Sequence, residues 1–220
     1  MKTRNYDTHW LVSVALMVAI TFVLGFTQIG FIPLPIIKAT TMHIPVIIGA
    51  ILLGPTAGGI LGFVFGICSI YRNTLVEPSV LSFAFSPFMS TTGISGALKA
   101  IWISVGCRIL IGVAAGWLWI LLKKIKFKKI KFKKIKLNQI VALVITGFVS
   151  SMVNTITVMG SIYVLFAHQY AEARNVEITA VWGLIMGTVT TSGILEAIAA
   201  AVIVPLVTKV LLRMRIVNGR

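Results

Sequence analysis

The chain has 220 residues, of which 58% are hydrophobic and only 11% are charged. Soluble globular domains carry about 25% charged residues, so this composition leaves too little polar material to cover a water-facing surface and excludes an ordinary soluble domain. The net charge of +15 is concentrated, because nine of the twenty Lys and Arg residues lie between Lys123 and Lys136. A local excess of this kind indicates contact with anionic lipid and argues against nucleic-acid binding.

Long apolar stretches separated by short polar segments predict membrane-spanning helices, because a helix satisfies its own backbone groups in lipid. The first span covers residues 10–29, and we interpret it as uncleaved because no small-residue cleavage site follows it. A segment that contains Gly and Pro, residues 30–41, separates it from the second span, residues 42–53. A Gly54-Pro55 turn then leads into the third span, residues 57–71.

The second and third spans are short against the roughly 20 residues that cross a bilayer. We therefore expect a kink at Pro45 or an incomplete crossing. Residues 72–99 mix prolines, serines and phenylalanines without a clear period, so we interpret them as irregular backbone that packs on protein near the outer surface. A polar link at residues 168–179 precedes the sixth span. The last three spans are residues 100–122, 140–166 and 180–212.

Six spans place both termini on the same side of the membrane, and the distribution of Lys and Arg identifies that side. Fifteen of the twenty belong to the side with the termini and the lysine-rich loop, against five on the opposite side. Positive residues concentrate in cytoplasmic segments, so the chain is predicted to be an all-α membrane protein of six transmembrane helices with cytoplasmic N- and C-termini. We expect residues 1–220 to form a single integral membrane substrate-binding domain.

The lysine-rich loop, residues 123–137, contains the tandem repeat KIKFK, KIKFK and KIKL. Its apolar residues recur in steps of two and three, so at 100° per residue they form no continuous face of a helix. We expect a flexible cytoplasmic linker that lies on the anionic inner leaflet. Docking of a partner protein to this loop stays open as an alternative.

Machinery for enzymatic catalysis is not visible in the sequence. The acidic residues number only five, which makes a paired-carboxylate site or a carboxylate metal cage hard to build: Asp7, Glu77, Glu172, Glu177 and Glu196. The dipeptide Gly-Lys, the motif HExxH and the motif GxSxG are all absent. We therefore expect no enzyme, no metal site and no cofactor, and uphill transport must take its energy from a partner or an ion gradient.

Polar and ionisable residues within the spans are the strongest candidates for a binding site, because each ionisable residue costs about 2.5–3.5 kcal/mol on insertion scales. Arg108 lies in the outer part of the fourth span and Glu196 in the outer-to-middle part of the sixth. Four neutral candidates lie at similar depth, namely Asn154, Thr155, Thr191 and Ser192. If these faces converge, they form a polar cavity open to the outside. An Arg108–Glu196 ion pair that only ties two helices together is the alternative, and the two are compatible.

Four further residues are candidates of other kinds. His43 and Asn73 lie at the outer ends of spans two and three, and we weigh substrate binding there against simple interfacial hydrogen bonding. Ala15 and Ala19 are four residues apart in span one and make a flat helix face on which another helix can pack closely. Taken alone, that face favours packing inside the same bundle.

Several motifs together resemble a known family. They are Ala15-x-x-x-Ala19 and the runs HIPVIIGAILLGP at residues 43–55, GGILG at 58–62, RILIG at 108–112 and EAI at 196–198. With six predicted helices, they make the chain similar to the substrate-binding S component of energy-coupling factor (ECF) transporters, over nearly the whole length except the lysine repeat. Within that family the sequence is most similar to the pantothenate-specific members, particularly over residues 43–55 and 154–163.

The resemblance implies a mechanism and partners. An S component captures a vitamin from outside, associates with a membrane coupling subunit that carries two cytosolic ATPases, and reorients to release the vitamin inside. Ala15 and Ala19 match the family's contact motif for the coupling subunit, which reverses the interpretation from packing alone. Arg108 with neutral donors such as Asn154 and Thr191 suits the carboxylate of pantothenate. Glu196 would repel that carboxylate, so it is assigned a positioning role.

The same resemblance implies a multi-pass protein of a bacterial cell membrane, with the bilayer, the vitamin and the transporter subunits as its partners. Two alternatives stay open. The substrate is another vitamin such as riboflavin or folate, or the chain is a proton- or sodium-coupled secondary transporter with Glu196 as its titratable acid. A membrane enzyme is the weakest alternative.

Overall fold

Helices dominate the structure, a computed structural model that describes residues 8–27, 31–33, 38–76, 78–90, 92–124 and 135–218. The α-helices are α1 (Thr8–Phe26), α2 (His43–Leu53), α3 (Pro55–Tyr71), α4 (Ser82–Phe85), α5 (Gly93–Ile101), α6 (Cys107–Lys124), α7 (Ile135–Arg174), α8 (Ile178–Thr188) and α9 (Ile194–Asn218). Tighter or wider helical turns are η2 (Arg72–Val76), η3 (Pro87–Met89), η4 (Trp102–Gly106) and η5 (Val189–Gly193). Two short strands, β1 (Phe31–Pro33) and β2 (Lys38–Thr40), pair antiparallel.

Five helical stretches are long and apolar enough to cross a membrane, which confirms the predicted helical membrane protein: Thr8–Phe26, Pro55–Val76, Gly93–Lys124, Gln139–Arg174 and Ile178–Arg213. The apolar helix α2 has only 11 residues. At 1.5 Å per residue it is about 16 Å long, roughly half of a bilayer core. The third span, by contrast, was expected to be short but extends over Pro55–Val76, 22 residues, which is long enough to cross a membrane. Pro45 lies in the first turn of α2, where a proline interrupts no helical hydrogen bond.

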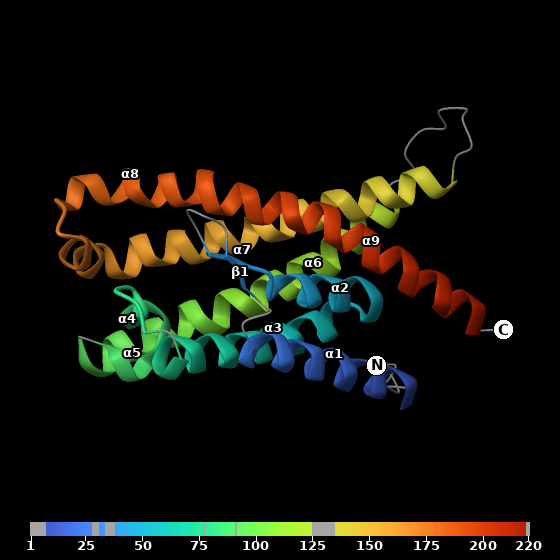
Figure 1. Cartoon of the computed structure of the whole chain (residues 1–220), viewed down its shortest axis with the longest axis horizontal. Helices are drawn as coiled ribbons and strands as arrows, with labels where there is room; N and C mark the ends of the chain where they lie inside the picture. Colours follow the sequence, from blue (N-terminus) through green and yellow to red (C-terminus); the bar gives the residue numbers. More distant parts are fainter. Residues whose placement is uncertain are drawn as a thin grey trace.

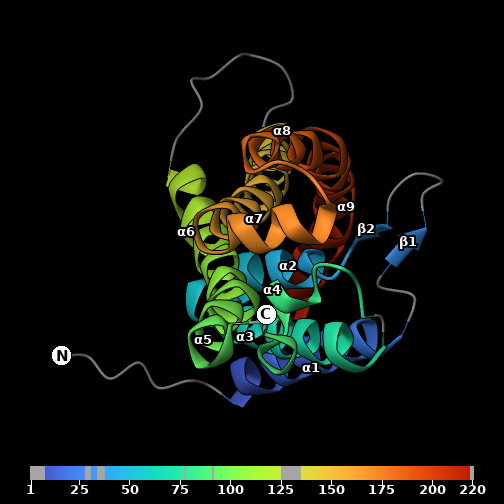
Figure 2. The same ribbon diagram turned by 90° about the vertical axis from the view of Figure 1, so that its left-hand side faces the viewer.

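The long helices lie side by side along one axis (Figure 1). The first turns of α1 and α7 lie at the same end of the bundle as the last turns of α6 and α9, while α4, α5 and the corner between α7 and α8 lie at the opposite end (Figure 1). Viewed along the bundle, α2 lies near its centre (Figure 2). It contacts α1, α3, α6, α7 and α9, so this short helix packs against each of these longer helices.

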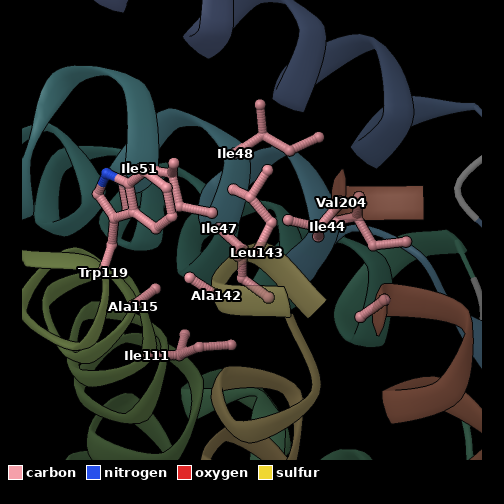
Figure 3. Close-up of a cluster of buried hydrophobic side chains, with 12 residues drawn as sticks. Ile44, Ile47, Ile48, Ile51, Ile111, Ala115, Trp119, Ala142, Leu143 and Val204 are labelled. Atoms are coloured by element: carbon pink, nitrogen blue, oxygen red, sulfur yellow. The ribbon is translucent and has the colours of Figure 1, made fainter. Parts of the chain in front are cut away.

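α2 is central because it is apolar on all sides, and its residues from His43 to Ile51 are all buried. Its isoleucines form a first cluster with residues of α6, α7 and α9 (Figure 3): Ile44, Ile47, Ile48, Ile51, Ile111, Ala115, Trp119, Ala142, Leu143 and Val204. A second cluster joins α4, η4, α6, α7 and α8, and it includes Phe83, Ile103, Cys107, Val158, Ile162, Phe166 and Val181. A third cluster packs α1 on α2 and α3 through Met17, Val18, Met42, Val46, Leu61 and Phe65.

The backbones of α3 and α6 approach each other closely because glycines lie at their interface. A Cβ atom on Gly58 would lie 2.2 Å from the carbonyl oxygen of Gly112, and one on Gly62 would lie 2.1 Å from the carbonyl oxygen of Arg108. Small residues at helix interfaces are the usual device for such contacts in membranes. The backbone of Arg108 therefore packs directly on α3.

Residues 72–99 differ from the predicted irregular backbone. They contain η2, α4, η3 and most of α5, and α5 continues through η4 into α6 as one apolar stretch, Gly93–Lys124. The β1–β2 pair within residues 30–41 was also not predicted. Both misses have the same cause: short elements are held by contacts to other parts of the chain, which hydropathy does not record.

The predicted end of span five at residue 166 marks a break within a longer helix. Phe166 has non-helical backbone angles, φ −137° and ψ 23°, but α7 resumes and ends at Arg174. The expected polar link at 168–179 is therefore too long, because polar residues remain helical after the helix leaves the apolar region. In the lysine-rich loop, residues 125–134 lie outside the described residues, and the predicted linker stays a prediction.

The α3–α6 contact yields a matched pair of substitutions. We expect Gly62→Ala to lower the free energy of unfolding by about 1–3 kcal/mol, because the new methyl group meets a backbone oxygen that has no room to shift. Gly59→Ala is the control, since its Cβ would lie 3.4 Å from a Val113 methyl group, an ordinary contact. Alanine also favours helix over glycine, so Gly59→Ala should be neutral or stabilising. Thermal unfolding in nanodiscs measures both, and equal effects would contradict the close approach.

Candidate functional site

Buried polar side chains separate the first apolar cluster from the second. On α6, Arg108 follows Cys107 of the second cluster and precedes Ile111 of the first. On α7, polar residues within 150–155 separate the two clusters in the same way, and His43 lies where α2 begins. We call this set the polar layer, defined by His43, Arg108, Ser151, Asn154 and Thr155.

Arg108 is the cation of the polar layer. Its guanidinium carbon lies 5.0 Å from the ring centroid of Phe65 on α3 and 5.8 Å from that of Phe85 on α4. Nε and Nη1 are buried and have no hydrogen-bond partner among the described residues. The predicted Arg108–Glu196 ion pair is not formed, because no nitrogen–oxygen distance between these two described side chains is within 4.0 Å. Two aromatic rings, rather than a carboxylate, are the guanidinium's neighbours.

His43 and α7 supply the neutral groups of the layer. His43 is fully buried, and its Nε2 forms a 3.1 Å hydrogen bond with Ser151 Oγ. One turn further along α7, the Thr155 hydroxyl donates to the Ser151 carbonyl oxygen at 3.3 Å. His43 Nδ1 and Asn154 Oδ1 are buried without a hydrogen-bond partner within the part of the chain that the structure describes. His43 also lies close enough to Arg108 for Coulombic interaction.

Glu196, in the first turn of α9, binds the end of strand β2. Its Oε1 accepts a hydrogen bond from the Thr40 backbone N–H at 2.8 Å and another from the Thr40 hydroxyl at 3.0 Å. Thr40 precedes the buried His43 by three residues. The carboxylate therefore fixes the segment that enters the polar layer at its α2 side.

Three other residues predicted for substrate binding form no hydrogen bond with the polar layer in the part of the chain that the structure describes. Thr191 is exposed, and its hydroxyl donates to the Gly187 carbonyl oxygen of its own helical turn at 2.7 Å. Asn73 is half-buried, and its amide donates to the Ser69 carbonyl oxygen one turn earlier at 2.9 Å. Ser192 is half-buried in η5. The structure brings together His43, Arg108, Asn154 and Thr155 from the predicted set.

Four residues of the site were missed by sequence reasoning: Thr40, Phe65, Phe85 and Ser151. In the sequence, Phe65 and Phe85 resemble any other apolar residue of a membrane helix. Their contact with Arg108 is made between three different helices, so the sequence does not reveal it. Ser151 carried a usable signal, since it lies three residues before Asn154 and so on the same face of a helix. Thr40 carried none, because 156 residues separate it from Glu196.

The free hydrogen-bonding atoms of the polar layer define what it can bind. Arg108 offers charged donors, Asn154 Oδ1 offers an acceptor, and His43 Nδ1 offers either, according to its tautomer. Each such atom costs about 1–3 kcal/mol when it is buried without a partner, so a ligand that pairs with them gains binding energy. An anion that also carries hydroxyl or amide hydrogens matches this set. Over the described residues, no group of three or more His, Cys, Asp or Glu side chains is placed to hold a metal ion.

Ala15 and Ala19 lie on a separate surface. Both are exposed on α1, whereas Val14 and Thr21 of the same helix are buried. The first interpretation of this motif, packing inside the bundle, is therefore wrong. The alanines and the exposed Leu16 form an uncovered apolar face.

This helical membrane bundle with a buried polar layer belongs to a known class of transport protein. Residues 9–208 match the family model for the substrate-specific component of ECF transporters, so the chain belongs to that family. It is 30% identical over 213 residues to the pantothenic acid transporter PanT of Lactococcus lactis subsp. cremoris (strain MG1363), which covers 94% of this chain and 96% of that protein. The chain is thus a transporter component of the cell membrane, not an enzyme.

The His43–Ser151 contact can be tested against an adjacent residue. Ser151→Ala should lower the free energy of unfolding by about 1–3 kcal/mol, because it leaves the buried Nε2 of His43 without its hydrogen-bond partner. Ser150→Ala is the control, since Ser150 is equally buried but its hydroxyl has no hydrogen-bond partner among the described residues. Removing that hydroxyl should be neutral or stabilising. If both alanines destabilise alike in thermal unfolding, the hydrogen bond to His43 contributes nothing.

Proposed function

We propose that this chain is a pantothenate-binding S component, which captures the vitamin from outside and delivers it through a coupling subunit powered by two ATPases. The observation that carries the proposal is the buried, unpaired guanidinium of Arg108 in the polar layer. Similarity to a pantothenic acid transporter over 94% of the chain supports the choice of vitamin.

The chemistry of pantothenate matches the free atoms of the polar layer. The molecule carries one carboxylate, two hydroxyl groups and one amide. We assign the carboxylate to the Arg108 guanidinium, whose buried Nε and Nη1 are free, because a charged donor and a carboxylate form the strongest hydrogen bonds available here. Asn154 Oδ1 then accepts from a hydroxyl or the amide N–H, and His43 Nδ1 pairs with a second group. Thr155 contributes to the wall beside Gly193, whose Cβ would lie 2.8 Å from the Thr155 methyl group.

For the topology, we propose six membrane passages with cytoplasmic termini, α2 being the short one. The beginnings of α1 and α7 and the ends of α6 and α9 share one end of the bundle, as an even number of passages requires (Figure 1). The excess of Lys and Arg beside these ends favours the cytoplasm. The polar layer then lies beneath α4, whose Phe85 contacts Arg108, on the side of the bundle away from the cytoplasm.

For the partners, we propose that the exposed face of Ala15 and Ala19 binds a helix of the coupling subunit. Small side chains allow close packing of helices in lipid, and these two lie on a face that the chain leaves uncovered. This chain carries no sequence motif for ATP hydrolysis, so ATPase subunits must supply the energy for uptake.

The partner face and the polar layer should be separable by mutation. We expect Ala15→Trp or Ala19→Trp to abolish pantothenate uptake while leaving binding affinity within about threefold, because the bulk blocks helix approach without reaching the site. Uptake is measured in vesicles with the coupling subunit and both ATPases, and the chain alone should bind without accumulating. Val164→Trp, on a strongly exposed position of α7, is the control and should retain uptake. A matched loss of affinity would show that the alanines support the fold.

The carboxylate assignment is tested at Arg108. Arg108→Gln should weaken pantothenate binding about tenfold to a hundredfold, as expected for hydrogen bonds to a charged group. Arg108→Lys should recover only part of this, since an ammonium lacks the planar fork. Pantothenol, the neutral alcohol analogue, should bind the wild type weakly and lose little in Arg108→Gln. Equal losses for acid and alcohol, measured by calorimetry, would refute the assignment, and Arg174→Gln on the exposed end of α7 controls for net charge.

A further inference from the structure

The unusual feature of the polar layer is that a buried arginine and a nearby glutamate are not paired. Arg108 on α6 and Glu196 on α9 carry opposite charges, and Glu196 binds Thr40, three residues before His43 of the polar layer. In the low dielectric of a bundle the attraction between opposite charges is far stronger than in water, so two such side chains normally form an ion pair. Here no nitrogen–oxygen distance between them is within 4.0 Å, although both residues are described.

Thr40 accounts for the separation. Both of its donors, the backbone N–H at 2.8 Å and the hydroxyl at 3.0 Å, bind the same carboxylate oxygen of Glu196. The two hydrogen bonds hold the carboxylate at the end of β2, and the guanidinium keeps Nε and Nη1 free. Hydrogen bonds to a charged acceptor are about twice as strong as neutral ones, so the pair of bonds is a strong competitor for the carboxylate.

We propose that Thr40 is a specificity-determining residue: it holds the Glu196 carboxylate away from Arg108 and so keeps the guanidinium available for an anionic substrate. This inference rests on the proposed function, in which Arg108 receives the carboxylate of the vitamin. Once released, Glu196 becomes an internal competitor for the same guanidinium. Because it is tethered to the site, its effective concentration is far above that of any free vitamin.

The proposal separates the role of Thr40 from ordinary support of the fold. If Thr40 only supports the fold, its substitution should weaken the binding of acid and alcohol ligands alike. A second substitution at Glu196 should then restore no affinity. If Thr40 instead restrains a competing carboxylate, its substitution should weaken the binding of the acid ligand alone. Removal of the Glu196 carboxylate should then restore the affinity for the acid. The two roles therefore predict opposite results for the double variant.

The test measures binding of pantothenate and pantothenol to four full-length proteins in nanodiscs: wild type, Thr40→Val, Glu196→Gln and the double variant. Thr40→Val loses the hydroxyl donor and should weaken pantothenate about tenfold, while pantothenol changes less than about threefold. Thr40→Ser keeps both donors and should bind both ligands as the wild type does. In the double variant, pantothenate affinity should return to within about threefold of the wild type, because a neutral amide competes weakly for Arg108.

Thr188→Val is the matched control, since its hydroxyl donates only to the Leu184 carbonyl oxygen of its own helix at 3.0 Å. Pantothenate binding to the double variant that stays as weak as in Thr40→Val would overturn the inference. So would equal weakening of acid and alcohol in Thr40→Val. A wild type that binds no pantothenate would instead refute the proposed function itself, and the assignment of Arg108 would fall with it.

A second measurement needs no ligand. The Thr40 amide should be protected from hydrogen exchange in the ligand-free wild type, because it donates to Glu196, and Glu196→Leu should remove this protection. Glu196→Gln keeps a carbonyl acceptor and should retain part of it. An unprotected Thr40 amide in the wild type would overturn the inference, whether or not the protein binds pantothenate.

Discussion

Desolvation of the Arg108 guanidinium is the constraint on which the rest of the site depends. A charged group inside an apolar bundle is stable only if its surroundings replace water. The chain replaces part of this water with the rings of Phe65 and Phe85, which attract the cation without occupying its N–H groups. Nε and Nη1 thus stay free while the cation is still stabilised. A carboxylate partner would be better for stability and worse for binding an anion.

Positioning of this cation requires rigid surroundings, and the fold supplies them through close backbone contacts. Gly62 allows α3 to lie against the Arg108 carbonyl oxygen, so the base of the side chain cannot move without moving the helix. Ser104, in the turn before Arg108, donates its hydroxyl to the Phe85 carbonyl oxygen and so fixes α4 over the guanidinium. α2 fills the other half of the bundle with isoleucines, which leaves the polar layer at the place where this short helix begins.

Sequence reasoning could predict what depends on local hydropathy and failed for what depends on contacts across the chain. Apolar stretches predicted the long helices, and the cost of buried charge singled out Arg108 and Glu196. Sequence reasoning could not show that Arg108 and Glu196 remain unpaired, because that outcome depends on Thr40, which is 156 residues from Glu196. Thr191 was a plausible ligand contact by depth alone, yet its hydroxyl bonds its own helix, and depth does not determine which face of a helix points inward.

The proposed partner face on α1 is related to the polar layer through α2, which α1 contacts. Residues 27–42 connect α1, with the exposed Ala15 and Ala19, to α2, with the buried His43. The third apolar cluster packs α1 on α2 and α3 directly. If the proposed docking displaces α1, that cluster would transmit the displacement to α2, while Glu196 holds Thr40 just before α2. The contact that is proposed to keep Arg108 free thus also holds the start of α2, the helix on which α1 packs.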